Sequence, residues 1–471
     1  MKTTRMWLKW FGAASLSAIG AVSHAQQAAE TVPTEAWSAA PISEAAPTTV
    51  ADAIPLEATA ATPDDRMPGE GIRLDEAITP IASYFQSAAS GAPGGKPKYP
   101  LITISGAAQI DAVWFAQDDA NQAVVGDAQD FAGFRRSRLG ALGNLADNVS
   151  YKMEYDFGSP GRPNFTDVWV STSDLPVVGN VKIGQWKQPF SMEPATSFRE
   201  LMFMERSLAF ALVPFRQTGI GAFNTAFDES ATWAISGYRF QTDSFGNDSG
   251  DSGYGMATRQ TLLLFENEYA DTIHIGGGYT INNPSTNQLR IRSAPEVGFT
   301  QQDFRNTTDF PAPFFVDSGV LPTDTYQVVG AELAGGFGSL LFQSEIMVAR
   351  VDQEVGPSLD FPAGYAQMGY VLTGERRAYN KQAGAYGRVV PDVNFGKGGP
   401  GAIEVAGRYS VLDLNDANIP GGRVQDLTAG INWYLNRYTR VEFNYIHPIL
   451  DRPVGNYTEA DIFGTRAQFD F

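Results

Sequence analysis

From Leu101 to the end, the sequence repeats short segments in which apolar and polar residues alternate. In "SYKMEYDF", Tyr151 and Met153 fall on one side of an extended strand, whereas Lys152 and Glu154 fall on the other. Such a period of two predicts β-strands that each carry one apolar face. The chain is therefore expected to be all-β and antiparallel, with its apolar faces against either a protein core or lipid.

The lengths of the connections favour lipid, because outer-membrane barrels have long loops at one end and tight turns at the other. We expect long connections near residues 118–129, 159–163, 191–218, 241–253, 284–322, 354–361, 415–422 and 450–458. Short connections are expected near 146–149, 175–178, 228–230, 269–270, 335–338 and 436–437. This alternation predicts a transmembrane β-barrel over residues 101–471.

The strand count depends on "KQAGAYGRVVPDVNFGKGGP", which contains Pro391 and several glycines. If this stretch is a connector at the short-turn end, the barrel has about 16 strands and both of its ends are periplasmic. If residues 384–396 formed a strand, the count would be odd, and single-chain bacterial barrels of this kind are even. We therefore expect 16 strands, with the final "TRAQFDF" placing Phe469 and Phe471 toward lipid.

The first 100 residues differ in character from the rest. Residues 1–25 combine a basic start, an apolar stretch and Ser23-His24-Ala25, which together predict a cleaved export signal; a retained membrane helix is the alternative. Residues 26–100 are rich in Ala, Pro, Thr and Glu without a helical or strand period, so we expect a disordered, acidic, periplasmic extension. No later run of about 18 apolar residues predicts a membrane helix.

Composition excludes several classes of function. The chain has no cysteine, three histidines and a formal net charge of −18, so we expect no Cys-based metal site, no cofactor and no nucleic-acid partner. Glu154 and Asp156 share a strand face, as the two carboxylates of a hydrolase pair do, but no catalytic motif accompanies them, so we expect no enzyme.

Several motifs resemble the phosphate-selective porin O/P family of bacterial outer-membrane porins. They are "FRRSRLG" (134–140), "GQWKQPFSMEPATSFRELMFMERS" (184–207), "YAQMGYVLTGERRAY" (365–379), "GAIEVAGRYSVLDLNDANIPGG" (401–422) and the final "RAQFDF". The resemblance covers most of residues 101–471. It implies a homotrimeric, 16-stranded porin in outer-membrane lipid, whose third loop folds into the lumen and narrows it.

Basic residues in and beside these motifs are candidates for an anion pathway, because guanidinium and ammonium groups bind phosphate and carboxylate oxygens. The candidates are Arg136, Arg138, Lys152, Lys187, Arg199, Arg206 and Arg216. The alternative is that these groups pair with Glu193, Glu200 and Glu205 and hold the shape of the loop. Arg135 has the wrong parity to face the lumen unless a bulge shifts it.

The function we expect is a passive pore for small hydrophilic solutes, in particular small anions such as phosphate. Acidic residues outnumber basic ones, so a general or cation-preferring porin is an alternative. A structural barrel whose N-terminal extension contacts the cell wall is a third possibility.

Overall fold

The computed structural model describes residues 99–158, 163–240, 246–247, 250, 253–284, 287–298, 312–452 and 456–471. The expected signal (1–25) and nearly all of the expected extension (26–100) lie outside the described residues. The described residues belong to one compact unit, Gly71–Phe471.

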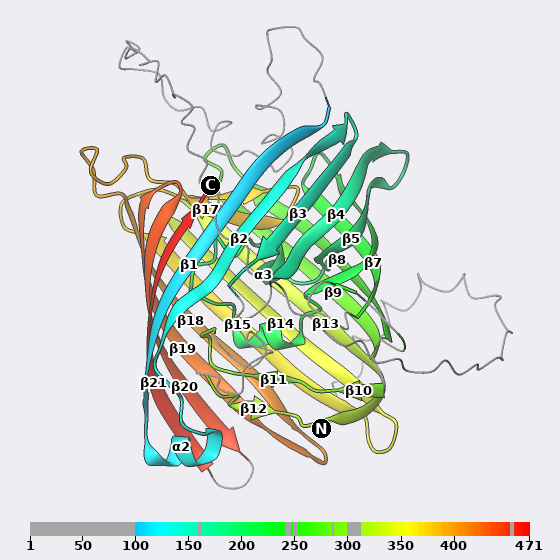
Figure 1. Ribbon diagram of the computed structural model, residues 1–471, viewed down its shortest axis with the longest axis vertical. Coiled ribbons are helices and arrows are strands. Elements are labelled where there is room, and N and C mark those ends of the chain that lie inside the picture. Colours follow the sequence, from blue (N-terminus) through cyan, green and yellow to red (C-terminus); the bar gives the residue numbers. More distant parts are fainter. Residues whose placement is uncertain are drawn as a thin grey trace, which may run out of the picture. The chain divides into compact units, whose positions relative to one another are not determined.

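Sixteen antiparallel strands close into a barrel, because β21 pairs with β1 through Phe463↔Trp114 and neighbouring residues (Figure 1). The first eight are β1 (Leu101–Gln117), β2 (Phe131–Ala146), β3 (Val149–Asp156), β4 (Asn164–Leu175), β5 (Gly179–Lys187), β6 (Arg216–Ala226), β7 (Ala231–Arg239) and β8 (Gly253–Glu266). The others are β9 (Thr272–Pro284), β13 (Leu321–Phe337), β14 (Leu340–Gln353), β15 (Leu359–Val371), β18 (Ala402–Asp416), β19 (Ile419–Asn436), β20 (Thr439–Arg452) and β21 (Asn456–Asp470). The predicted strand number is confirmed.

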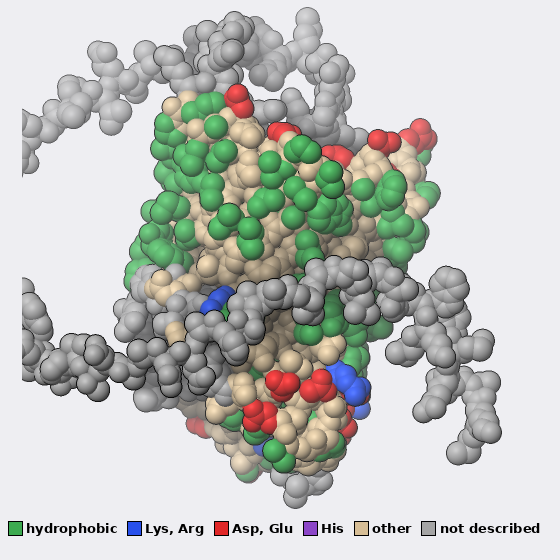
Figure 2. Space-filling model, turned by 90° about the vertical axis from the view of Figure 1, so that its right-hand side faces the viewer, with side chains coloured by type: hydrophobic (Ala, Val, Ile, Leu, Met, Phe, Trp, Pro, Cys, Tyr) green, Lys and Arg blue, Asp and Glu red, His purple; other side chains and the backbone are tan. Residues whose placement is uncertain are grey.

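The alternation in the sequence becomes an apolar outer wall and a polar inner wall. In β3, the side chain of Met153 is 44 % exposed, whereas Glu154 is 2 % exposed and points inward. In β21, Phe469 is exposed on the outside and Arg466 is buried inside. Figure 2 shows hydrophobic side chains spread over the outer wall, and the exposed apolar residues come from strands all around the barrel. This arrangement suits lipid outside and a polar lumen within.

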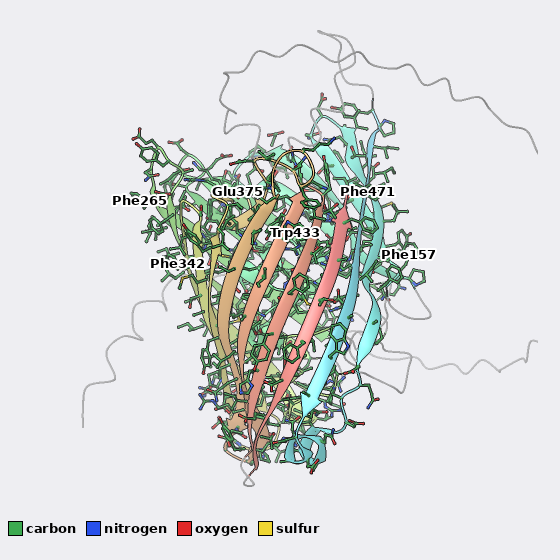
Figure 3. All side chains as sticks on the ribbon, turned by 90° about the vertical axis from the view of Figure 1, so that its left-hand side faces the viewer. Phe157, Phe265, Phe342, Glu375, Trp433 and Phe471 are labelled. Carbon is green, nitrogen blue, oxygen red and sulfur yellow. The ribbon has the colours of Figure 1, made fainter. Side chains whose placement is uncertain are left out.

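The turns that the sequence predicts to be short lie at one end of the barrel, together with the last residue. Phe471 exchanges backbone hydrogen bonds of 3.0 Å with Gly106, and Figure 3 places it at the same end as Phe265 and Glu375. The side chain of Phe471 is exposed, as expected for a ring at the membrane interface. Within the part of the chain that the structure describes, no helix is both long and apolar enough to span a membrane.

Two expected long connections are wrong. Strands β20 and β21 pair as far as Arg452↔Asn456, so only residues 453–455 link them where a loop over 450–458 was expected. Strands β18 and β19 continue to pair as far as Asp416↔Ile419, so only residues 417–418 link them where a loop over 415–422 was expected. The Pro and Gly residues of "NIPGG" suggested a loop, but Ala417 adopts a positive φ of 47° and closes a tight turn between two long strands.

Among the described residues, three connecting segments that carry secondary structure of their own fold into the lumen. The third loop (188–215) contains α3 (Met192–Ala195) and the 3-10 helix η2 (Leu208–Leu212). The fifth loop, described over 287–298 and 312–320, contains β10 (Gln288–Leu289), β11 (Arg292–Ser293) and β12 (Val316–Asp317). The connector (372–401) contains β16 (Arg377–Asn380) and β17 (Ala385–Val389), which form a separate two-stranded sheet. The connector is therefore not a barrel strand, as predicted.

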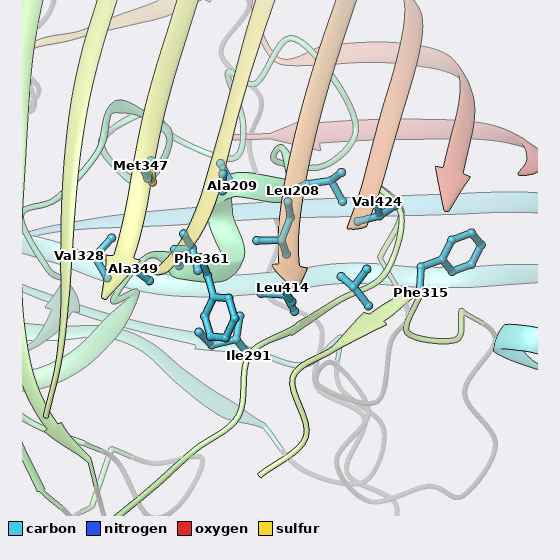
Figure 4. Close-up of a cluster of buried hydrophobic side chains, with 14 of the residues drawn as sticks. Leu208, Ala209, Ile291, Phe315, Val328, Met347, Ala349, Phe361, Leu414 and Val424 are labelled. Atoms are coloured by element: carbon cyan, nitrogen blue, oxygen red, sulfur yellow. The ribbon is translucent and has the colours of Figure 1, made fainter. Parts of the chain in front are cut away.

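Apolar side chains hold these segments against the inner wall. Leu208 and Ala209 of η2 pack with Ile291 and Phe315 of the fifth loop (Figure 4). The same cluster includes wall residues from β13, β14, β15, β18 and β19, such as Val328. The lumen of this barrel thus contains a hydrophobic core of its own, which explains why the third loop is rich in Met, Leu and Phe.

Candidate permeation site

The inner wall holds the third loop by its backbone. Arg440 of β20 donates to the carbonyl of Leu201 at 2.7 Å, and Asn432 of β19 donates to that of Met202 at 2.8 Å. Arg408 of β18 donates to the carbonyl of Glu205 at 3.1 Å. Each of these donors comes from the polar face of a strand, so the alternation of the strands positions the loop. Residues 201–205 are consequently fixed along the β18–β21 side of the lumen.

Glu205 of the third loop is the meeting point of three arginines. Arg136 donates to both carboxylate oxygens at 2.9 Å, and Arg135 donates to both at 3.0 and 3.3 Å. Arg466 donates to one of them at 2.8 Å. Burial raises the pKa of Glu205, but the positive charges of Arg135, Arg136 and Arg466 lower it by more. The net effect holds the pKa of Glu205 well below its usual range. Glu205 is therefore ionised, and it offsets part of the positive charge of this cluster.

A β-bulge brings Arg135 into this cluster. Gln109 of β1 pairs with Arg136, but the next residue, Ile110, pairs with Phe134, so Arg135 is an extra residue in β2. The extra residue rotates the guanidinium group toward the lumen. Parity alone would turn Arg135 away from the lumen, and the bulge that makes the exception is present in β2.

Three other candidates have local partners. Arg138 donates to Asp156 at 2.7 Å, and Arg216 donates to Asp167 at 2.8 Å. Arg206 bonds no carboxylate within the described chain; it donates to the backbone carbonyl of Glu193 at 3.0 Å. The alternative that these groups hold the shape of the lumen therefore has direct contacts in its favour.

A cavity of about 620 Å³ lies between the third loop, the inner wall of β3–β8 and the connector. Of the candidate residues, Lys152, Lys187 and Arg199 line it. The other four candidates, Arg136, Arg138, Arg206 and Arg216, are not among its lining residues. The seven candidates therefore divide between this cavity and the contacts that hold the loops in place.

The cavity is locally basic even though the chain is acidic. Its basic lining residues are Lys152, Lys182, Lys187, Arg199, Arg259, Arg388 and Arg437. Its acidic lining residues are Asp167, Glu200 and Asp470. Seven basic and three acidic side chains along a passage with low-dielectric walls favour an anion over a cation, and the excess falls by one because Arg259 is paired with Glu332, which does not line the cavity.

Sequence reasoning missed four of these basic residues. Lys182 alternates with Val181 and Ile183 on β5, so the period of two could have placed it on the inner wall. Arg388 lies in the connector and Arg437 in the turn after β19, where no period indicates direction. Arg259 pairs with Glu332 at 2.8 Å, a contact between strands distant in sequence.

Within the described residues, no group of three or more His, Cys, Asp or Glu side chains could hold a metal ion. The cavity itself is lined by charged and aromatic side chains.

Comparisons with known proteins agree with this architecture. Residues 103–471 match the family model described as phosphate-selective porin O and P. Porin O of Pseudomonas aeruginosa is 25% identical over 382 residues, which cover 74% of this chain and 83% of that protein. An uncharacterized protein of Caulobacter vibrioides is 27% identical over 388 residues, 78% of this chain and 73% of that protein.

Solved structures of porins also align with the barrel. An anion-selective porin from Comamonas acidovorans aligns with a TM-score of 0.49 and 12% identity, covering 79% of this chain and 99% of that one. The outer membrane channel DcaP of Acinetobacter baumannii aligns with a TM-score of 0.48 and 12% identity, covering 79% of this chain and 97% of that one.

Proposed function

Because the chain belongs to the phosphate-selective porin O and P family and lies in the outer membrane, we propose that it forms a passive, water-filled channel for small hydrophilic anions, inorganic phosphate among them. The observation that carries this proposal is the excess of basic side chains around the cavity beside the third loop. Diffusion through such a pore needs no bound cofactor and no covalent chemistry.

Electrostatics supports the anion preference. One unpaired charge about 4 Å from an ion is worth roughly 4 kcal/mol at an effective dielectric constant of about 20, before salt screening. Among the described residues, neither Lys182 nor Lys187 forms an ion pair with a carboxylate. Lys187 donates to the carbonyls of Pro194 and Thr196, whereas Lys182 has no hydrogen-bond acceptor within the described chain, so the charge of Lys182 is the more available to a passing ion. Lys152 is paired with Asp167 at 2.9 Å and contributes less.

The test is the reversal potential in a KCl gradient across a planar bilayer. We expect the native protein to prefer chloride, and Lys187→Gln to reduce that preference because it removes a charge that lines the cavity. Lys397→Gln is the matched control, since Lys397 is an exposed residue of the connector outside the cavity lining. A native protein that prefers potassium would overturn the anion proposal and leave a cation-preferring porin.

The same recording separates the two groups of candidates. Arg136 is bound to Glu205, so Arg136→Ala is expected to change ion preference less than Lys187→Gln does. A larger shift for Arg136→Ala would place the selective region at the Glu205 cluster. Absence of any channel activity would instead favour a structural barrel.

We also propose that the functional unit is a homotrimer, an expectation that comes from the family resemblance. Chemical cross-linking of the protein in native outer membranes is expected to give a ladder that ends at three chains. A ladder that stops at one chain would contradict this.

A further inference from the structure

Lys182 is held between two aromatic rings on the wall of the cavity. Its Nζ lies 4.3 Å from the ring centre of Trp169 and 4.9 Å from that of Phe223. Trp169 comes from β4, Lys182 from β5 and Phe223 from β6, so three neighbouring strands build this arrangement on their inner face. The rings attract the ammonium through their electron-rich faces and hold it in place.

Lys182 differs from the other two lysines that line the cavity. Lys187 donates to the carbonyl of Pro194 at 2.7 Å, and Lys152 donates to Asp167 at 2.9 Å. Among the described residues, no acceptor receives a hydrogen bond from Lys182 and no carboxylate lies within 4.0 Å of it. An ammonium group has three N–H donors, and the two rings satisfy none of them with an oxygen. Lys182 therefore presents a positioned but unpaired charge.

The surroundings of Lys182 are aromatic as well as basic. Trp186, Tyr379 and Tyr386 line the same cavity, whose volume of about 620 Å³ falls within the usual range of small-molecule sites. Inorganic phosphate would occupy a small part of this space. Phosphate has no apolar surface to place against the aromatic rings. The rings also cannot supply the hydrogen bonds that phosphate would lose when it leaves water.

We propose that this cavity binds organic anions that carry an aromatic ring, with the carboxylate on Lys182 and the ring against Trp169. The proposal rests on the proposed porin function and names a class of solute for the pore. The carboxylate supplies the acceptor that Lys182 lacks, and the ring gains stacking contacts with an indole held beside the charge. A solute that has only a carboxylate or only an aromatic ring gains one of these two contributions to its binding free energy.

The test measures equilibrium binding to the folded full-length protein in detergent by ligand-observed saturation-transfer NMR. The probes are benzoate, acetate, benzyl alcohol and inorganic phosphate. We expect benzoate to bind roughly tenfold more tightly than acetate or benzyl alcohol. Benzoate makes both the contact with the ammonium and the contact with the ring, whereas each of the other two makes only one. Phosphate that displaces benzoate and binds more tightly would overturn the proposal in favour of an inorganic-anion site.

Two variants assign the contacts. Lys182→Gln is expected to reduce benzoate affinity to that of benzyl alcohol, and Trp169→Leu to reduce it to that of acetate. Lys397→Gln is the charge-matched control and should bind benzoate as the native protein does. Unboiled samples on gels check the fold of each variant; if Lys182→Gln does not fold, Trp169→Leu decides the question.

The outcome is separable from that of the porin proposal. Equal affinities for benzoate and acetate, together with anion-selective currents, would overturn the aromatic site and leave the anion pore. Preferential benzoate binding without any current would leave the site and overturn the pore.

Discussion

Glu205 shows how one side chain can determine the shape of a lumen. Its carboxylate accepts hydrogen bonds from Arg135 and Arg136 of β2 and from Arg466 of β21. Glu205→Gln keeps the shape but removes the charge, and we expect it to destabilise the barrel by about 3–5 kcal/mol, the usual cost of breaking a buried ion pair. The temperature at which the folded, unboiled band disappears on a gel should fall.

Glu229→Gln provides the control, because Glu229 is exposed in a turn after β6. Equal band stability for the two variants would mean that the loop is held without Glu205.

The effect of pH has a defined sign: folding lowers the pKa of Glu205, so its stabilisation is present above the ordinary carboxyl pKa and is lost as the pH falls below it.

At the scale of an element, the connector is as much a part of the pore as the third loop. Arg259 of β8 donates to the carbonyls of Ala383 and Gly384 at 2.9 and 2.7 Å, which draws the β16–β17 hairpin into the lumen. Replacing residues 377–389 by a short Gly-Ser turn is expected to raise single-channel conductance, because it removes chain from the lumen where narrow points limit flow.

That replacement also removes Arg377, which pairs with buried Glu404 at 2.8 Å. The replacement should therefore carry Glu404→Gln, so that no buried carboxylate is left unpaired. Replacing the exposed residues 393–398 of the same connector is the control. If the conductance of the two proteins is the same, the hairpin does not limit the pore.

At the scale of the whole molecule, the barrel closes on itself between β1 and β21. Residues 26–97 show no period that could bury an apolar face, so we expect them to be dispensable for the barrel. A protein exported by its own signal but lacking residues 26–97 should insert into the outer membrane, migrate differently before and after boiling, and conduct like the native chain. Failure to insert would show that the extension has a structural role.

The alternation of residues within strands allowed much of the fold to be predicted. The faces of β3 and β21 follow directly from a period of two, which is a local property of an extended backbone. Parity alone turns Arg135 outward, and only the register of β1 and β2 shows the bulge that brings it inside. The expected long loops over 415–422 and 450–458 are wrong, because the strands continue to pair as far as Asp416↔Ile419 and Arg452↔Asn456.

The candidate site was less predictable, since its contacts join residues far apart in the chain. Lys152, Lys187 and Arg199 were identified and do line the cavity. Arg388 lines the same cavity and pairs with Asp470 at 2.9 Å. Strands β18, β19, β20 and nearly all of β21 lie between these two residues in the sequence. No spacing in the sequence indicates such a pair.

The sequence by itself determined the closed antiparallel barrel, its lipid-facing side chains and the connector that is not a strand. These features depend on local periodicity and on the requirement that a membrane-spanning sheet leave no unpaired edge. Only the tertiary structure decided which basic groups are paired and which are available. Arg136 is bound to Glu205, whereas Lys182 lies between Trp169 and Phe223 with no carboxylate partner in the described part of the chain. Pairing inside the lumen depends on how the inward loops pack against distant strands, and that packing is a property of the whole folded chain.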